Sequence, residues 1–180
     1  MSTDAIYRVS TTRHSPLKFS SLIFMRWKNR QFWIAALVSF VLDQLTKYWV
    51  VQNFQLGETQ PLWSGVFHLT YVTNTGAAFS LFTGKVEWLR WLSLAVSLLL
   101  IAWAWFGPAM QTLEQLGYGF ILGGALGNGI DRFFAGSVVD FLDFRLIRFP
   151  VFNLADVFIN LGIVCLLIAS FPKATTNKSR

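Results

Sequence analysis

Two aspartates, Asp140 and Asp156, are the candidate catalytic groups, because each lies beside a long apolar segment. An acid at membrane depth is costly, so such a residue indicates a functional site. Two carboxyls held close together do not both ionise, and the pair can supply one general base and one general acid. One would take a proton from water as it attacks an amide carbonyl, and the other would protonate the leaving amine.

Other chemistries find less support in the residue types. His14 and His68 have no Cys, Asp or Glu at metal-ligand spacing, so we expect no metal and no other cofactor. The serines form no G-x-S-x-G motif. Spacing alone leaves a Ser/Lys dyad open, but Lys47 follows Asp43 by one helical turn and is expected to pair with it. The single cysteine, Cys165, allows no disulfide.

Apolar helices must position these residues. Of the 180 residues, 54% are hydrophobic and 13% charged, and the mean hydropathy is +0.49. This balance is typical of an integral membrane protein, in which about 20 apolar residues span the bilayer as a helix. We predict an all-α membrane protein with four transmembrane helices at residues 31–51, 88–106, 117–135 and 151–171.

Charge patterning predicts the orientation of the helices. Lys and Arg residues, which give the chain a net charge of +6, concentrate in residues 1–30 and 172–180. The positive-inside bias places both termini in the cytoplasm, as an even number of spans requires. The 107–116 loop has no Lys or Arg, so this orientation rests on the termini. We expect no nucleic-acid partner.

The chain divides into one membrane domain with two basic tails. Residues 1–30, rich in Ser and Thr, suit a disordered cytoplasmic tail or a transit-like segment, and we favour the tail. The first span is too long for a cleavable secretory signal, and no small-x-small site follows it. Residues 31–171 form the predicted membrane domain, residues 52–87 an extracytoplasmic insert, and residues 172–180 a second cytoplasmic tail.

The charged residues of the spans gather at their extracytoplasmic ends, and the inner halves carry no charge. A proton-coupled carrier needs polar groups near the midplane and a route to both faces, so this asymmetry favours an enzyme at the outer interface. Two alternatives stay open. One is a small four-helix proton-coupled transporter that uses Asp156, and the other is a non-catalytic assembly subunit.

Two spacings predict how the site is assembled. Asn128 and Asp131 are three residues apart, as are Asn153 and Asp156, so each pair should share a helix face, where the amide can orient the acid. A further pattern of small residues lets the third span pack closely on a neighbour and brings Asn128 to a facing helix. It consists of Gly119, Gly123 and Gly127.

The 52–87 insert contains a strand signal. Residues 66–73 are rich in β-branched and aromatic side chains, and Pro61 and Gly65 mark the preceding turn. A backbone edge there could hold an extended peptide by strand addition.

Five sequence blocks carry a resemblance to a known family. They are Asp43-Gln44-Leu45-Thr46-Lys47, Asn74-Thr75-Gly76-Ala77-Ala78-Phe79, Gly127-Asn128-Gly129-Ile130-Asp131-Arg132, Val138-Val139-Asp140-Phe141 and Phe152-Asn153-Leu154-Ala155-Asp156. Together they resemble the lipoprotein signal peptidases, or signal peptidase II. The resemblance implies an aspartyl peptidase of the bacterial inner membrane that cuts the signal peptide from a prolipoprotein, just before a diacylglyceryl-modified cysteine. It also implies a small extracytoplasmic sheet between the first and second helices.

The resemblance assigns roles to individual residues. The family's catalytic aspartates correspond to Asp140 and Asp156. Its supporting polar residues correspond to Asp43, Lys47, Asn74, Asn128, Asp131, Arg132 and Asn153. We expect Arg132 to anchor the surrounding loop or the substrate backbone, and we expect a monomer in contact with membrane phospholipid. The chain departs from the pattern in its 1–30 extension and in Asp143, which offers an alternative partner for Asp140.

Plain structural interpretations compete with some of these roles. Asp43 and Lys47 lie at i,i+4 and suit a structural ion pair. Asp131 and Arg132 suit an interfacial ion pair that caps the third span.

Two other acids have comparable interpretations. Asp143, near Arg145 and Arg148, is interpreted as a solvated loop charge. Asp156 could instead complement the dipole at a helix N-terminus.

Overall fold

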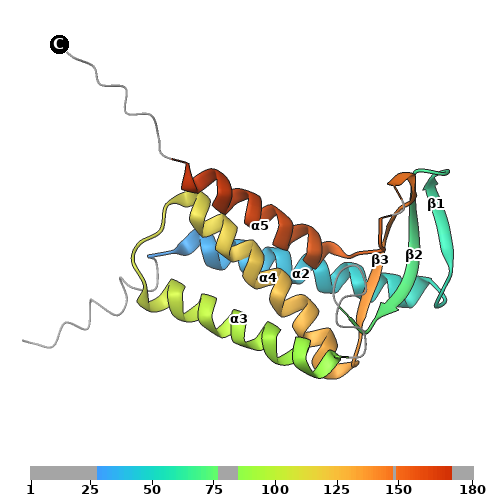
Figure 1. Cartoon of the computed structure of the whole chain (residues 1–180), viewed down its shortest axis with the longest axis horizontal. Coiled ribbons are helices and arrows are strands. Elements are labelled where there is room, and N and C mark those ends of the chain that lie inside the picture. Colours follow the sequence, from blue (N-terminus) through green and yellow to red (C-terminus); the bar gives the residue numbers. More distant parts are fainter. Residues whose placement is uncertain (1–27, 77–84, 148, 172–180) are drawn as a thin grey trace, which may run out of the picture.

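The structure is a computed structural model that describes residues 28–76, 85–147 and 149–171. Among these residues, four α-helices and three strands follow one another along the chain (Figure 1). The helices are α2 (Arg30–Asn53), α3 (Val86–Phe106), α4 (Thr112–Phe134) and α5 (Leu154–Ser170). The strands are β1 (Thr59–Trp63), β2 (Phe67–Asn74) and β3 (Val138–Phe144), and a short 3-10 helix, η2 (Arg145–Ile147), follows β3. Most of the 1–30 tail and the whole 172–180 tail lie outside the described residues.

Each of the four predicted spans corresponds to a helix. Within the described part of the chain, α2 and α3 are long and apolar enough to cross a membrane, with mean hydropathies of 1.4 and 1.7. The α5 helix is apolar but has 17 residues, which gives it a length of about 25 Å. The α4 helix has polar or charged residues near both ends in addition to its glycines, and it is not among the helices that meet this criterion. The four-span count therefore stays a prediction.

The α4 helix packs between α2 and α5, and glycines make the close approach possible. A Cβ at Gly123 would lie 1.9 Å from the hydroxyl oxygen of Ser39 on α2. A Cβ at Gly124 would lie 2.5 Å from the carbonyl oxygen of Ala155 on α5. The predicted close packing of the third span is thereby confirmed. The glycines that face α2 are Gly119, Gly123 and Gly127.

The sheet differs from the prediction in its composition. Its order is β1-β2-β3, and both strand pairs are antiparallel. The insert between α2 and α3 supplies β1 and β2, but β3 comes from the connection between α4 and α5. From the sequence alone, the whole sheet is expected within the insert and Asp140 in a connection. In the structure Asp140 lies within β3, opposite Val72.

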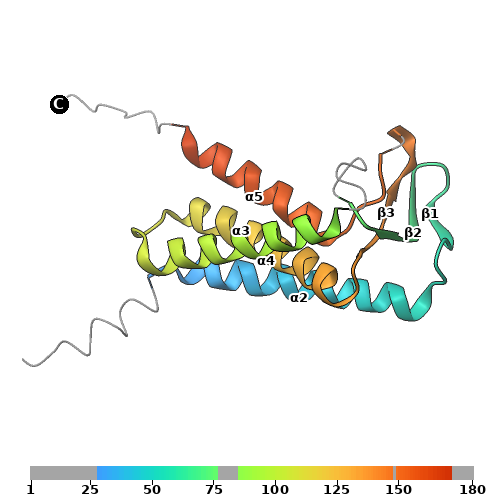
Figure 2. The same ribbon diagram turned by 60° about the horizontal axis from the view of Figure 1, so that its bottom comes forward.

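The sheet stands at one end of the helix bundle (Figures 1 and 2). Val50 and Phe54, at the end of α2, pack with Phe141 of β3 in a buried apolar cluster. Backbone hydrogen bonds between Leu142 and Phe152 then tie β3 to the segment that leads into α5. This junction places β3 and the start of α5 side by side.

Candidate active site

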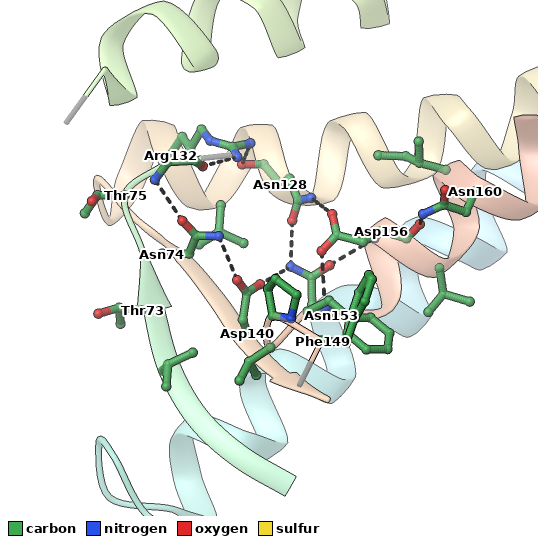
Figure 3. A pocket seen from close by; sticks show the side chains of 18 of the residues that line it. Thr73, Asn74, Thr75, Asn128, Arg132, Asp140, Phe149, Asn153, Asp156 and Asn160 are labelled. Atoms are coloured by element: carbon green, nitrogen blue, oxygen red, sulfur yellow. Dashed lines mark hydrogen bonds between the residues drawn. The ribbon is translucent and has the colours of Figure 1, made fainter. Parts of the chain in front are cut away.

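A cavity of about 950 Å³ lies where α4, α5, β2 and β3 meet. Both candidate aspartates line it, Asp140 from β3 and Asp156 from α5. Figure 3 shows their side chains on either side of Asn153. The structure thus brings together two acids from separate elements, as the sequence analysis predicted. Four further predicted residues line the same cavity: Asn74, Asn128, Arg132 and Asn153.

Asp140 is held by two amides. Asp140 is only 2% exposed to solvent. The Oδ1 atom accepts a hydrogen bond of 2.6 Å from Asn153 Nδ2, and Oδ2 accepts one of 2.9 Å from Asn74 Nδ2. Burial raises the pKa of Asp140 to about 6 against the opposing effect of the Asn74 hydrogen bond, and the negative charge of Asp156 adds to the rise. This carboxyl therefore keeps its proton up to about pH 6, well above the range of an ordinary aspartate.

Asp156 lies in the first turn of α5. Its Oδ1 atom accepts a hydrogen bond of 2.9 Å from Asn128 Nδ2, and Oδ2 accepts one of 3.3 Å from the backbone N–H of Asn153. In return the backbone N–H of Asp156 donates to Asn153 Oδ1 at 3.1 Å. The two residues form a capping box, so Asp156 also has the helix-terminal position that the structural interpretation describes.

Asn153 differs from its predicted position. Asn153 is the N-cap of α5 and precedes the first helical residue, so it does not share a helix face with Asp156 as predicted. The side chain of each residue instead accepts a hydrogen bond from the backbone N–H of the other. Its Nδ2 atom donates to Asp140 and also, at 3.0 Å, to Asn128 Oδ1. Asn153 therefore connects the two carboxyls, because Asn128 itself donates to Asp156.

A buried ionic cluster from α2 and α4 supports the site. Lys47 forms ion pairs of 2.8 Å with both Asp43 and Asp131, and it donates to Asn128 Oδ1 at 2.9 Å. Asp43 Oδ1 in turn accepts a hydrogen bond of 2.9 Å from the backbone N–H of Ala155. The predicted pairing of Asp43 with Lys47 is confirmed. Because Lys47 contacts both Asn128 and Asp131, the predicted common face of that pair is confirmed as well.

Arg132 does not form the predicted ion pair with Asp131, because Asp131 pairs with Lys47. The guanidinium instead donates to the carbonyl oxygens of Asn128 and Gly76, at 3.3 and 3.1 Å. These contacts fix the end of β2, which carries Asn74. Residues 77–79 of the Asn74 sequence block lie outside the described residues.

The interpretation of Asp143 as a solvated loop charge is wrong. Asp143 lies in β3 with 8% exposure, accepts a hydrogen bond of 2.7 Å from Thr70 and pairs with Arg145 at 2.8 Å. Side chains alternate along a strand, so Asp143 and Asp140 point to opposite faces of the sheet. Asp143 is therefore no partner for Asp140. Within the described ranges, no three His, Cys, Asp or Glu side chains are grouped to hold a metal ion.

Sequence reasoning missed two polar residues near the site. Gln44 donates to Asp43 Oδ2 at 3.2 Å and to Asp131 Oδ1 at 3.1 Å, and so links the two acids of the ionic cluster. Asn160 lines the cavity one helical turn beyond Asp156 and donates to its carbonyl oxygen at 2.8 Å. The sequence offered two signals: Gln44 directly follows Asp43, and Asn160 is an amide in an otherwise apolar part of the fourth span.

Comparisons with known proteins agree with this site. The profile of the family described as signal peptidase (SPase) II matches residues 35–172. A lipoprotein signal peptidase of Nostoc punctiforme is 72% identical over 156 residues, which cover 87% of this chain and 99% of that protein. One from Synechocystis is 62% identical over 152 residues, which cover 84% and 94%.

Solved structures show the same likeness. A bacterial membrane enzyme determined by the in meso method superposes with a TM-score of 0.71 at 27% identity, with 93% of this chain and 96% of that chain covered. A second structure of that description gives a TM-score of 0.67 at 26% identity, with 87% and 96% covered. The chain therefore belongs to the signal peptidase II family of bacterial membrane peptidases.

Proposed function

We propose that this peptidase removes the signal peptide from diacylglyceryl-modified prolipoproteins, cutting just before the lipidated cysteine, with Asp140 and Asp156 as its catalytic dyad. The observation that carries the proposal is the placement of both carboxyls on the wall of one cavity, connected through Asn153. The relatives' description as lipoprotein signal peptidases supports the substrate class.

The dyad works with one shared proton. The ionised carboxylate takes a proton from water as the water oxygen attacks the scissile carbonyl, and a C–O bond forms. The protonated carboxyl then gives its proton to the leaving nitrogen as the C–N bond breaks. The raised pKa supports Asp140 as the group that holds the proton at rest. No covalent intermediate and no cofactor are needed.

The amides around the dyad keep its geometry. Asn74 and Asn153 hold both oxygens of Asp140, and Asn128 holds Asp156. Arg132 anchors the end of β2 through Gly76, so the strand that carries Asn74 stays in register with the cavity. An extended peptide lies along the sheet while its scissile bond reaches the dyad.

The site lies at the outer face of the bacterial inner membrane. In this arrangement all four helices span the bilayer, both termini are cytoplasmic, and the sheet is extracytoplasmic. The terminal Lys and Arg residues and the location of the sheet at one end of the bundle support it. The substrate's acyl chains lie among the helices at the outer leaflet, together with membrane phospholipid, and the enzyme acts as a monomer.

One assay tests the proposal. Purified protein is mixed with a diacylglyceryl-modified precursor or with its unmodified twin, and the products are identified by mass spectrometry. Only the lipidated precursor is expected to be shortened, at the bond before the modified cysteine. Asp140→Asn and Asp156→Asn should each abolish cleavage while the protein stays folded. Wild-type turnover in either variant would remove that residue from the mechanism, and equal cleavage of both precursors would overturn the substrate assignment.

A further inference from the structure

Three asparagines, Asn74, Asn128 and Asn153, hold the carboxyls of the dyad. Among the described residues, Lys47 is the only cation of α2 that contacts one of these amides. It is 4% exposed and lies between two acids, Asp43 and Asp131, at 2.8 Å from each. Its third contact is the donation to Asn128 Oδ1 at 2.9 Å. An ammonium group has three protons and no acceptor, so these three contacts use its whole donor capacity.

This contact determines which way the Asn128 amide points. An amide has an accepting oxygen and a donating NH2 group, and an ammonium can only donate. The Asn128 atom that faces Lys47 must therefore be Oδ1. The same oxygen accepts a hydrogen bond of 3.0 Å from Asn153 Nδ2. The NH2 group is left on the opposite side, where it donates to Asp156 Oδ1 at 2.9 Å.

We propose that Lys47 is a positioning residue of the peptidase, which keeps the Asn128 amide in the one orientation that donates to Asp156. This inference rests on the proposed role of the dyad. The contacts of Lys47 are with Asp43, Asp131 and Asn128, so it acts on the dyad through Asn128. Asp43 and Asp131 hold the ammonium group in place, and Gln44 links these two acids.

Without a donor at position 47, the Asn128 oxygen keeps only the hydrogen bond from Asn153 Nδ2, and less opposes rotation of the amide by half a turn. Its carbonyl oxygen would then face Asp156, and two acceptors can share a hydrogen bond only if the carboxyl carries a proton. In that orientation Asn128 no longer donates to Asp156, and the proposed base loses a hydrogen bond that holds it. The donor at Lys47 thus acts through Asn128 on an acid of another helix.

Other charges also act on the dyad, so a test must hold them constant. Asp156 on α5 is flanked by Asp140 from β3 and Arg132 from α4, and Lys47 from α2 acts on Asp140. Removing Lys47 alone would change this field and leave Asp43 and Asp131 buried without their cation. The experiment therefore removes one acid together with the cation.

Two double variants differ only in the donor. Asp131→Asn/Lys47→Gln keeps an N–H that can reach Asn128, whereas Asp131→Asn/Lys47→Met has the same net charge and no donor. Cleavage of the diacylglyceryl-modified precursor is followed from pH 4 to pH 9, with thermal unfolding measured in detergent as the control for folding. The proposal expects the kcat of the Met variant to be about 100-fold lower than that of the charge-matched Gln variant, as removal of one aligned donor predicts. The Met variant should show little change in KM and a pH profile moved to higher pH.

The outcomes separate the alternatives. Two double variants with the same kcat and the same pH profile would show that Lys47 acts only through charge or packing, and would overturn the proposal. A wild-type enzyme that leaves the lipidated precursor intact, or an active Asp140→Asn variant, would instead contradict the proposed function.

A third variant keeps the inference testable if the Met variant does not fold. Asn128→Asp retains an oxygen for Lys47 and strengthens that contact, but it presents a second oxygen to Asp156. The proposal expects a folded protein with at least a 100-fold lower kcat and a pH profile moved to higher pH. Wild-type kcat in this variant would show that the Lys47 contact matters only for structure.

Discussion

Asn153 donates a hydrogen bond of 2.6 Å to Asp140, and the oxygen of the same side chain caps the helix that carries Asp156. The oxygen of this amide thus stabilises the start of α5, and its nitrogen holds a carboxyl of the proposed dyad. The two roles can be separated by substitution, because aspartate caps a helix as well as asparagine does but has no N–H to donate.

Asn153→Asp should keep the cap of α5 and lose the activity of the protein. The new carboxylate still accepts from the Asp156 backbone N–H, but it repels Asp140, so kcat should fall at least 100-fold. Asn153→Ala removes the cap too, and its free energy of unfolding should drop by about 1 kcal/mol. Thermal unfolding and cleavage rates measured on both variants check this. A wild-type free energy of unfolding in Asn153→Ala would contradict the capping role.

The pH dependence of cleavage should have a descending limb near pH 6. The one-proton dyad loses its proton as the pH rises through the raised pKa of Asp140, about 6, and the general acid disappears. The dependence of kcat/KM on pH, which reports the free enzyme, should fall about tenfold per pH unit above that point. The pair titrates as a unit, so the limb belongs to the dyad. A profile that stays flat between pH 5 and pH 9 would contradict this assignment.

Asp140→Asn should stabilise the protein at alkaline pH although it abolishes cleavage. The folded pKa of Asp140 lies above its unfolded value of 3.8, so proton binding favours the folded state at low pH and stability is lost as the pH rises through about 6. The loss amounts to at most about 3 kcal/mol for two pKa units. Unfolding temperatures of variant and wild type should coincide near pH 4 and separate at pH 8. The opposite order at pH 8 would be inconsistent with a raised pKa.

Much of the architecture could be predicted from the sequence, because its signals are local. Apolar length gives the helices, and α2 begins and ends within two residues of the predicted span. The i,i+4 spacing predicts the ion pair of Asp43 with Lys47, and the glycine pattern predicts the face of α4 that packs closely against α2. The family membership confirms the predicted peptidase and sets aside the transporter and assembly alternatives. The roles of the individual site residues stay predictions.

What the sequence did not show depends on long-range pairing. The β3 strand carries two acids in seven residues and was expected to be a connection before the fourth span, whereas its pairing with β2 makes it a strand. The burial of Asp143 follows from that pairing, because Thr70 and Arg145 become its partners. The link from Lys47 through Asn128 to Asp156 joins three helices, and no spacing within one segment encodes it.

Gly124→Ala should displace the first turn of α5. Its Cβ would lie 2.5 Å from the carbonyl oxygen of Ala155, which is backbone and cannot rotate away. Overpacking of this kind costs about 1–3 kcal/mol, and the shift of Asp156 should lower kcat. Gly129→Ala is the matched control on the same helix, because the nearest atom to its Cβ is Ser93 Cβ at 3.1 Å. Equal effects of the two substitutions on kcat would show that α5 can shift without harm.

Asp143→Asn should leave cleavage unchanged. Burial opposes ionisation of Asp143, but hydrogen bonds from Thr70 and Arg145 outweigh it and hold the pKa of this carboxyl below its usual value. Its interactions lie on the face of the sheet opposite Asp140, so only local stability should decrease. A kcat within twofold of wild type, measured beside the inactive Asp140→Asn, would fit this expectation. Loss of activity would mean that the interactions of Asp143 affect the position of Asp140 through β3.

The two candidate catalytic acids lie on β3 and on α5, the last strand and the last helix of the described chain. A nascent polypeptide whose first three helices have already been inserted still lacks both carboxyls in their working positions. With Asp140 and Asp156 as the proposed dyad, a stalled or truncated translation product that lacks α5 is expected to be hydrolytically inert toward its neighbours in the bilayer.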